Sequence, residues 1–477
     1  MHISVRTGLI SAFLPAILCL QGCFSPVKYA TPLDEAVVEN TYGDLALTGE
    51  IRDRWWESFG DSELNKFVEI VLENSPTLQS AYLKLLDSEY AVTQSKAGYY
   101  PSASLNAGVG AGGNVYNEAS ADPNYSLGLS ASYEIDIWGK VRAQKRVAEL
   151  SMYAAQDAAE SAALSLVGNV VTEWFAVKYY RDRQKLTQEL LEIAEGYYEL
   201  VEEYYRNGQT TGMDVLEQRQ QIETLRATLN ELDTNIRISQ HKLRILAGGK
   251  AAPVVEGSLP EEIDVGGSID VDSLLENRPD IRSARRNAEQ ADARVVIAIA
   301  DRLPTLRLSA SLSYRSKSIT ELFERLAWDV AASLAVNLFD GFNKTTAIDR
   351  AKVAYLQQRL AYGVAVMQAI AEVEEALLNL NLRKQNLIDA RAQLERQRDI
   401  LEVSREYFTG GQVTYNRVLS ALRSLISASQ SELDARRQLL NAQITFYKAM
   451  GGSGWLKDTS EQNSKRAKEM LKQLDED

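Results

Sequence analysis

Cys23 is the residue of this sequence that is best placed to undergo a chemical modification. It ends the stretch "LQGC" (residues 20–23), which follows a basic residue, Arg6, and an apolar run, "LISAFLPAILCL". A basic start, an apolar run and a small residue before the cleavage point are typical of a signal peptide. The stretch resembles a lipobox, in which the cysteine becomes the first residue of the mature chain and carries lipid. We therefore predict a signal peptide at residues 1–22 and a covalent lipid on Cys23. The alternative is ordinary cleavage beside an incidental cysteine.

The rest of the sequence carries few residues of the types that catalyse reactions or bind metals. It has two cysteines and two histidines, and after residue 22 only Cys23 and His241 remain. That inventory cannot form a Cys/His zinc site or a His-based triad, and no Walker or dinucleotide-binding loop is present. The formal net charge of −13 argues against a nucleic-acid partner. We therefore expect no enzyme, no metal and no cofactor apart from the lipid.

Four segments alternate apolar and polar residues, as strands with one apolar face do. In "YSLGLSASYEIDI" (residues 125–137), apolar residues and tyrosines alternate with serine, glycine and acidic residues. The predicted strands cover residues of about 102–115, 124–138, 305–316 and 327–339. At about 3.3 Å per residue, the quoted segment is roughly 40 Å long, which suits a tilted membrane crossing. A soluble β-sandwich would alternate in the same way, but so few strands in so helical a chain fit it poorly.

The chain contains two repeats, which are separated by a constant offset of 203 residues. This offset aligns "NSP" at 74–76 with "NRP" at 277–279, and it still holds where residues 248–249 align with residues 451–452. One offset that is kept from end to end indicates two structural units of the same kind. The predicted organisation is a lead-in at 23–73, repeat 1 at 74–249, a linker at 250–276, repeat 2 at 277–452 and a charged tail at 453–477.

Most of the remaining sequence predicts very long helices. All ten prolines lie at or before Pro304, and none lies between residues 124 and 252. Residues 140–206 can therefore form one helix of about 100 Å. Leu387, Leu394 and Leu401 are seven residues apart, a spacing that is typical of coiled-coil packing.

The number of predicted strands bears on how the chain assembles. Four strands cannot close a barrel, and an open sheet edge cannot face lipid because its backbone groups would lack hydrogen bonds. Several chains must therefore contribute strands to one barrel. We expect the apolar face to meet lipid and the polar face to line a wet lumen.

The residues quoted so far belong to a pattern that resembles a known family, the outer-membrane factors. These are the TolC-like channel proteins of tripartite efflux pumps and type I secretion systems, and the resemblance is greatest to the lipidated drug-efflux branch. It covers nearly all of the chain from Cys23 to Gly452. It is carried by "YEIDIWGKVR" (133–142), "NRPDIRSARRNAEQADARVVIAIADRLPTLRLSASL" (277–312), "LFDGFNK" (338–344), and the duplicated "YYRNGQTTGMDVL" (204–216) and "EYFTGGQVTYNRVL" (406–419).

The resemblance implies a mixed α and β fold: a trimeric 12-stranded transmembrane β-barrel with four strands per chain, continued by a long α-helical periplasmic barrel. It implies a passive, gated duct in the Gram-negative outer membrane that carries small toxic compounds outward. The implied partners are two further copies of the chain, a periplasmic adaptor (membrane fusion protein), an inner-membrane pump of the RND type and outer-membrane lipid. Two alternatives stay open: a type I protein-secretion duct of the same fold, and a structural periplasmic coiled-coil lipoprotein.

The family also implies candidate site residues. Its helix–helix turns at the far end of the tunnel bind the adaptor, and charges just beyond them close the tunnel. The implied tip residues are Gly208, Gln209, Thr210, Gly411, Gln412 and Val413, and the gate candidates are Asp214, Glu217, Arg417, Ser420 and Arg423. Because Ser420 stands where related channels often carry an acid, an acid–arginine pair between the repeats must use Glu217 or Asp214. The alternatives are plain turn chemistry for the glycines and solvated helix charges for the gate candidates.

Overall fold

The computed structural model describes residues 54–112, 122–250, 253–260 and 277–451, together with residues 465, 467–469, 471 and 472. The predicted signal peptide and the predicted lipidation site, Cys23, lie outside these ranges, as do most of the predicted linker and tail. The chain divides into two compact units. The first includes residues 91–151 and 287–363, and the second includes residues 45–90, 152–286 and 364–477.

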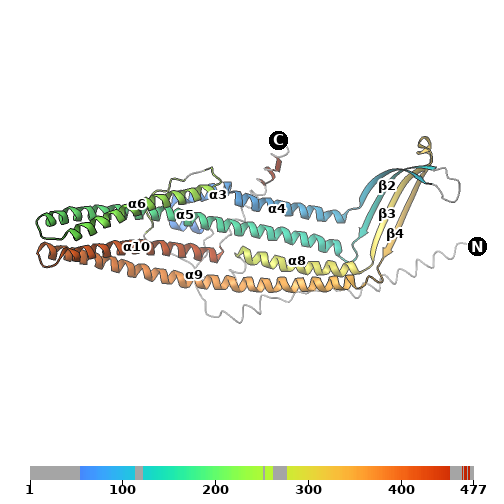
Figure 1. Ribbon diagram of the computed structural model, residues 1–477. Coiled ribbons are helices and arrows are strands. Elements are labelled where there is room, and N and C mark those ends of the chain that lie inside the picture. Colours follow the sequence, from blue (N-terminus) through green and yellow to red (C-terminus); the bar gives the residue numbers. More distant parts are fainter. Residues whose placement is uncertain are drawn as a thin grey trace, which may run out of the picture. The chain divides into compact units, whose positions relative to one another are not determined.

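The first unit contains an antiparallel sheet with the strand order β1-β2-β3-β4 (Figure 1). The strands are β1 (Ser102–Gly112), β2 (Asp122–Ile135), β3 (Thr305–Ser316) and β4 (Leu326–Ala335). Repeat 1 therefore supplies one hairpin and repeat 2 the other, and β2 and β3 pair to join them into one sheet. The prediction of four strands is confirmed.

The register of the strands places their apolar residues on one face and their polar residues on the other. Leu129 pairs with Leu105 and with Leu312, and Leu312 in turn pairs with Trp328. The adjacent row, which must point to the opposite face, consists of Ser104, Ser130, Ser311 and Asp329. The hydroxyls of Ser104 and Ser130 lie 2.8 Å apart. The sheet thus has one apolar face and one face that is rich in hydroxyl groups.

The strands end earlier than the alternating pattern does. The alternation continues to Ile137 and Leu338, and the predicted strands continue to Trp138 and Phe339, but pairing stops at Ile135 and Ala335. The reason lies in β3, which begins at Thr305 because the preceding residue, Pro304, has no N–H with which to extend the ladder. The carbonyl of Pro304 instead accepts a hydrogen bond of 2.6 Å from the indole N–H of Trp138.

The helices repeat in the order that the internal offset predicts (Figure 1). Short helices precede the hairpins: α4 (Pro76–Ser95) in repeat 1 and α8 (Pro279–Arg302) in repeat 2. Long helices follow them: α5 (Lys140–Arg206) and α6 (Gly212–Leu246), and α9 (Asn343–Thr409) and α10 (Tyr415–Met450). Helices α5 and α9 each have 67 residues, and both are unbroken, as the absence of proline predicts. No helix within the described ranges is long and apolar enough to cross a membrane.

The second unit has its main core where the lead-in packs on the long helices. Trp55 and Trp56 are fully buried, and the ring of Trp55 stacks on that of Tyr447 with centroids 5.4 Å apart. Asp61 caps α3 (Ser62–Asn74) by accepting hydrogen bonds from the N–H groups of Glu63 and Leu64. Its carboxylate also lies 2.8 Å from the ammonium of Lys178 on α5. Although burial opposes the shift, these donors hold the pKa of Asp61 below its usual value.

The described part of the linker, residues 253–260, is fixed to helices of both repeats. Val255 and Leu259 are buried. The N–H of Leu259 donates to Asp182 of α5 at 2.8 Å, and its carbonyl accepts from Arg436 of α10 at 2.9 Å. This segment therefore ties α5 to α10 within the second unit.

Candidate functional site

The two predicted tip turns have the same backbone geometry. Gly208 has φ +72° and Gly411 has φ +69°, the left-handed conformation that favours glycine after a helix. The backbone N–H that follows each glycine donates a hydrogen bond of 2.8 Å to the helix before it. Gln209 donates to the carbonyl of Tyr204, and Gln412 donates to the carbonyl of Tyr407. Turn chemistry therefore accounts for these glycines, and their contact with an adaptor stays a prediction.

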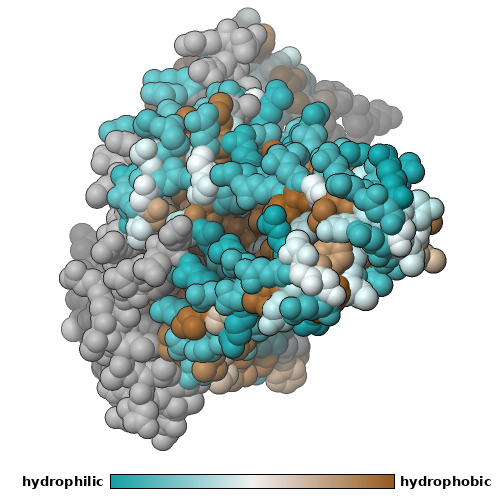
Figure 2. Space-filling model, turned by 90° about the vertical axis from the view of Figure 1, so that its left-hand side faces the viewer, coloured by the Kyte–Doolittle hydropathy of each residue, from teal (hydrophilic) through white to brown (hydrophobic). Residues whose placement is uncertain are grey.

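The two turns lie side by side in the second unit (Figure 1). Aromatic side chains pack between them. The rings of Tyr204 and Phe408 are 5.1 Å apart, and those of Phe408 and Tyr415 are 5.7 Å apart. A small core lies beneath them, formed by Val201, Tyr415, Val418 and Leu419. Figure 2 looks at the side that bears these turns, where hydrophilic residues predominate among the coloured ones. The tip is thus a mostly polar surface over a packed apolar centre.

The gate candidates fall into three groups in the structure. Asp214 is buried and forms a capping box with Thr211. Its carboxylate accepts a hydrogen bond of 2.9 Å from the Thr211 N–H and one of 2.7 Å from the Thr211 hydroxyl. Glu217 and Arg423 form an ion pair of 3.6 Å between the two repeats, and their side chains are 37% and 46% exposed. Arg417 and Ser420 lie exposed on α10. The structure therefore brings together one predicted acid–arginine pair and engages Asp214 with its own helix. The part of each residue in gating stays a prediction.

Sequence reasoning missed a buried polar pair next to these residues. The hydroxyl of Tyr415 donates to Gln218 Oε1 at 3.1 Å, and Gln218 Nε2 donates to the carbonyl of Ala194 at 2.6 Å. Gln218 is 0% exposed and Tyr415 is 2% exposed. Burial raises the pKa of Tyr415 above its usual value, so the hydroxyl keeps its proton. One signal was available: the offset of 203 aligns Tyr415 with Gly212 and Gln218 with Ala421, so both residues break the repeat.

A second buried cluster, the Arg282 cluster, joins α8 to α5. The guanidinium of Arg282 contacts Asp157 at 2.7 Å through Nε and also contacts Glu160. Burial raises the pKa of both carboxyls, although Arg282 opposes the shift. The cluster fixes the start of repeat 2 against the long helix of repeat 1.

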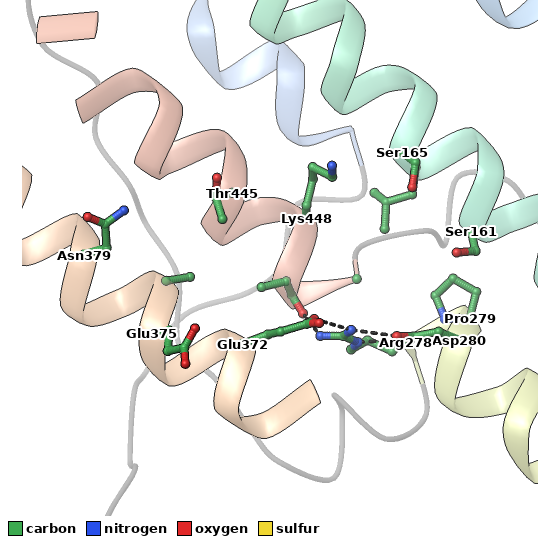
Figure 3. Close-up of a pocket in the computed structure, with 14 residues that line it drawn as sticks. Ser161, Ser165, Arg278, Pro279, Asp280, Glu372, Glu375, Asn379, Thr445 and Lys448 are labelled. Atoms are coloured by element: carbon green, nitrogen blue, oxygen red, sulfur yellow. Dashed lines mark hydrogen bonds and ion pairs between the residues drawn. The ribbon is translucent and has the colours of Figure 1, made fainter. Parts of the chain in front are cut away.

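Arg278 fixes the end of α10 in a similar way (Figure 3). Its guanidinium lies 2.7 Å from both Asp280 and Glu372 and donates to the carbonyl of Ala449 at 2.9 Å. Beside it is an open crevice of about 580 Å³, which is lined by polar residues that include Lys448. Among the residues that the structure describes, no group of three or more His, Cys, Asp or Glu side chains is placed to hold a metal ion.

The chain belongs to the outer membrane efflux protein family. The family model matches residues 67–249 and 271–452. The protein is therefore an efflux channel of the outer membrane, a class of ducts rather than of enzymes.

The chain resembles several characterised members over nearly its whole length. It is 27% identical over 468 residues to the pyoverdine export outer membrane protein OpmQ of Pseudomonas aeruginosa, covering 94% of this chain and 97% of that protein. It is 24% identical over 463 residues to the probable outer membrane lipoprotein SilC of Salmonella typhimurium, covering 93% and 98%. Among solved structures, the Campylobacter jejuni CmeC outer membrane channel superposes with a TM-score of 0.80 at 22% identity, covering 88% of this chain and 92% of that chain. The last comparison confirms the predicted fold.

Proposed function

We propose that the protein is the outer-membrane duct of a tripartite efflux pump and that it works as a homotrimer. It would be passive and gated, with a periplasmic adaptor (membrane fusion protein) at its tip and an inner-membrane pump of the RND type supplying the energy. The observation that carries this proposal is the open four-stranded sheet with one predominantly apolar face.

The apolar face needs a covering that the described part of the chain does not supply. Val109 is 78% exposed and Trp328 is 76% exposed, although both lie on the apolar side of the sheet. β1 and β4 also have unpaired edges within the sheet, which lipid cannot satisfy with hydrogen bonds. Three copies placed edge to edge would give twelve strands, a closed barrel with an apolar exterior.

The opposite face suits an aqueous lumen. Its central rows consist mainly of serine and glycine, which leave space and offer hydroxyl groups to water. This face carries charges of both signs: Glu134 lies 3.6 Å from Arg307 at one end, Asp329 lies opposite Ser311, and Arg315 lies opposite Ser126. Because both signs are present, this lining supports a duct that accepts cargo of either sign.

The nature of the cargo is part of the proposal. OpmQ is named for pyoverdine export and CusC of Escherichia coli for cation efflux. These names support small compounds rather than secreted polypeptides as the cargo of this chain. We place the predicted lipid on Cys23 in the outer membrane, as SilC is named a lipoprotein.

Reconstitution of the purified full-length protein into planar lipid bilayers tests the proposal. We expect a heat-resistant trimer in gel electrophoresis and discrete conductance steps in the bilayer. A folded protein that stays monomeric and never conducts would contradict the proposal and support a periplasmic scaffold.

A further inference from the structure

We propose that the buried Gln218–Tyr415 pair holds the tip in its closed resting state and does so independently of salt. The inference rests on the proposed function, because it concerns the gate of that duct. It assigns two positioning residues that lie beneath the exposed charges of the tip.

The pair connects three helices at one point near the turns. Tyr415 is the first residue of α10, Gln218 lies on α6, and the Ala194 carbonyl belongs to α5. The relay runs from the Tyr415 hydroxyl to Gln218 Oε1 and from Gln218 Nε2 to that carbonyl. It therefore ties the start of α10, in repeat 2, to both helices of repeat 1.

The positions that the offset of 203 residues aligns with this pair cannot form the same hydrogen bond. Gly212, which aligns with Tyr415, has no side chain, and Ala421, which aligns with Gln218, has no polar atom. A buried polar group costs free energy unless it is hydrogen-bonded. While α6 and α10 are packed together, the hydrogen bond between Gln218 and Tyr415 removes this cost for both side chains. If the helices separate, water can hydrate both groups. The pair therefore favours the packed arrangement over a separated one.

The exposed ion pair at the tip behaves differently. Glu217 and Arg423 are 3.6 Å apart, and solvent reaches more than a third of each side chain, so salt weakens their attraction. Gln218 and Tyr415 are neutral and buried, so ionic strength has little effect on their hydrogen bond. A tip that stays closed at high salt would depend on the buried pair.

The effect on the gate can be stated as a fold-change. Loss of one net hydrogen bond shifts an equilibrium by about fivefold. If three chains open together, loss of the bond in each would raise the resting open probability by roughly 100-fold.

Planar-bilayer recordings of assembled trimers test the inference with three variants. Tyr415→Phe removes the hydroxyl and keeps the ring that contacts Phe408. Gln218→Met removes the amide and keeps a side chain of similar length. Both single variants should raise the resting open probability in 0.1 M and in 1 M KCl. The double variant should also raise the resting open probability, but by less than the product of the two single effects, because both changes break the same bond.

Two controls separate this effect from others. Tyr407→Phe removes a hydroxyl from a half-exposed tyrosine of the same turn, and it should leave the resting open probability unchanged. Glu217→Gln should act at 0.1 M KCl and lose its effect at 1 M KCl, where the screening length is about 3 Å. If Tyr415→Phe does not assemble, Gln218→Met breaks the same bond from the other side.

The outcomes also separate this inference from the proposed function. If wild-type channels conduct and both single variants keep the wild-type resting open probability, the inference is wrong and the duct remains. An effect of the single variants that disappears at 1 M KCl would also overturn it. If the wild-type protein itself forms no channel, the proposed function fails first.

Discussion

Replacing Arg282 with methionine should leave two buried carboxylates of α5 without the cation that they share. Asp157 is 6% exposed and Glu160 is 5% exposed, and both contact the Arg282 guanidinium. Methionine retains most of the aliphatic length of the side chain, so the main loss is the charge and its hydrogen bonds.

The size of the effect follows from burial. Removing one partner of a buried ion pair costs about 3–5 kcal/mol, because the remaining charge stays in a poorly solvated site. A matched surface pair provides the control: Arg226 lies 2.7 Å from Glu195, but both side chains are exposed. Arg226→Met should cost less than about 1 kcal/mol.

The penalty should also depend on pH. Burial raises the pKa of Asp157 and of Glu160 in the folded protein. The folded chain therefore holds protons that the unfolded chain has released, so the stability from these carboxyls is full below about pH 4 and falls as the pH rises through their folded-state pKa. Arg282→Met removes the charge that opposes this rise, so the variant should lose more stability at pH 8 than at pH 5.

Thermal unfolding of the purified protein, followed by circular dichroism at pH 5, 6.5 and 8, measures this effect. The account predicts a large loss of melting temperature for Arg282→Met at pH 8, a smaller loss at pH 5 and little change for Arg226→Met. Equal losses for the two variants, or a loss that grows as the pH falls, would refute the reasoning about burial.

Three further predictions concern the anchor, the lead-in and the gate. Cys23→Ser should abolish incorporation of labelled palmitate, and an unmodified N-terminus of the mature wild-type protein by intact mass would contradict the lipid. Asp61→Ala removes the cap of α3 and leaves the buried Lys178 without its carboxylate, so it should lower the melting temperature and make residues near the lead-in cleavable by protease. Protease resistance equal to that of the wild type would disprove this anchoring role. Arg417→Ser combined with Arg423→Ser should raise resting conductance and sensitise cells to vancomycin; unchanged conductance in assembled channels would leave both arginines as solvated helix surface.

The sequence predicts the elements well because each element leaves a local periodic pattern. Alternation from Tyr125 onward predicts β2, and the absence of proline predicts the unbroken α5. Where a strand stops depends on its neighbour, however, and here the limit is set by Pro304, which precedes β3. The alternating pattern of residues 125–137 could not reveal this limit.

The candidate site was predictable only in part, and the reason is sequence distance. The family resemblance pointed to Glu217 and Arg423, and the structure brings these two together. The Gln218–Tyr415 bond joins residues 197 positions apart, and the Arg282 contact with Asp157 joins residues 125 apart. No periodic pattern records such contacts, because they depend on how α6, α8 and α10 pack against the helices of the other repeat.

The accessibility of two adjacent residues of β2 tests the central claim, that the polar face of the sheet lines a water-filled duct. Ser130 lies on the hydroxyl-rich face and Leu129 on the apolar face. Each is replaced by cysteine, and a charged methanethiosulfonate reagent is added to the water during single-channel recording. The account predicts that Ser130→Cys channels lose conductance in three steps, one per chain, and that Leu129→Cys channels do not respond. Reaction at Leu129→Cys without reaction at Ser130→Cys, or equal reaction at both, would contradict it.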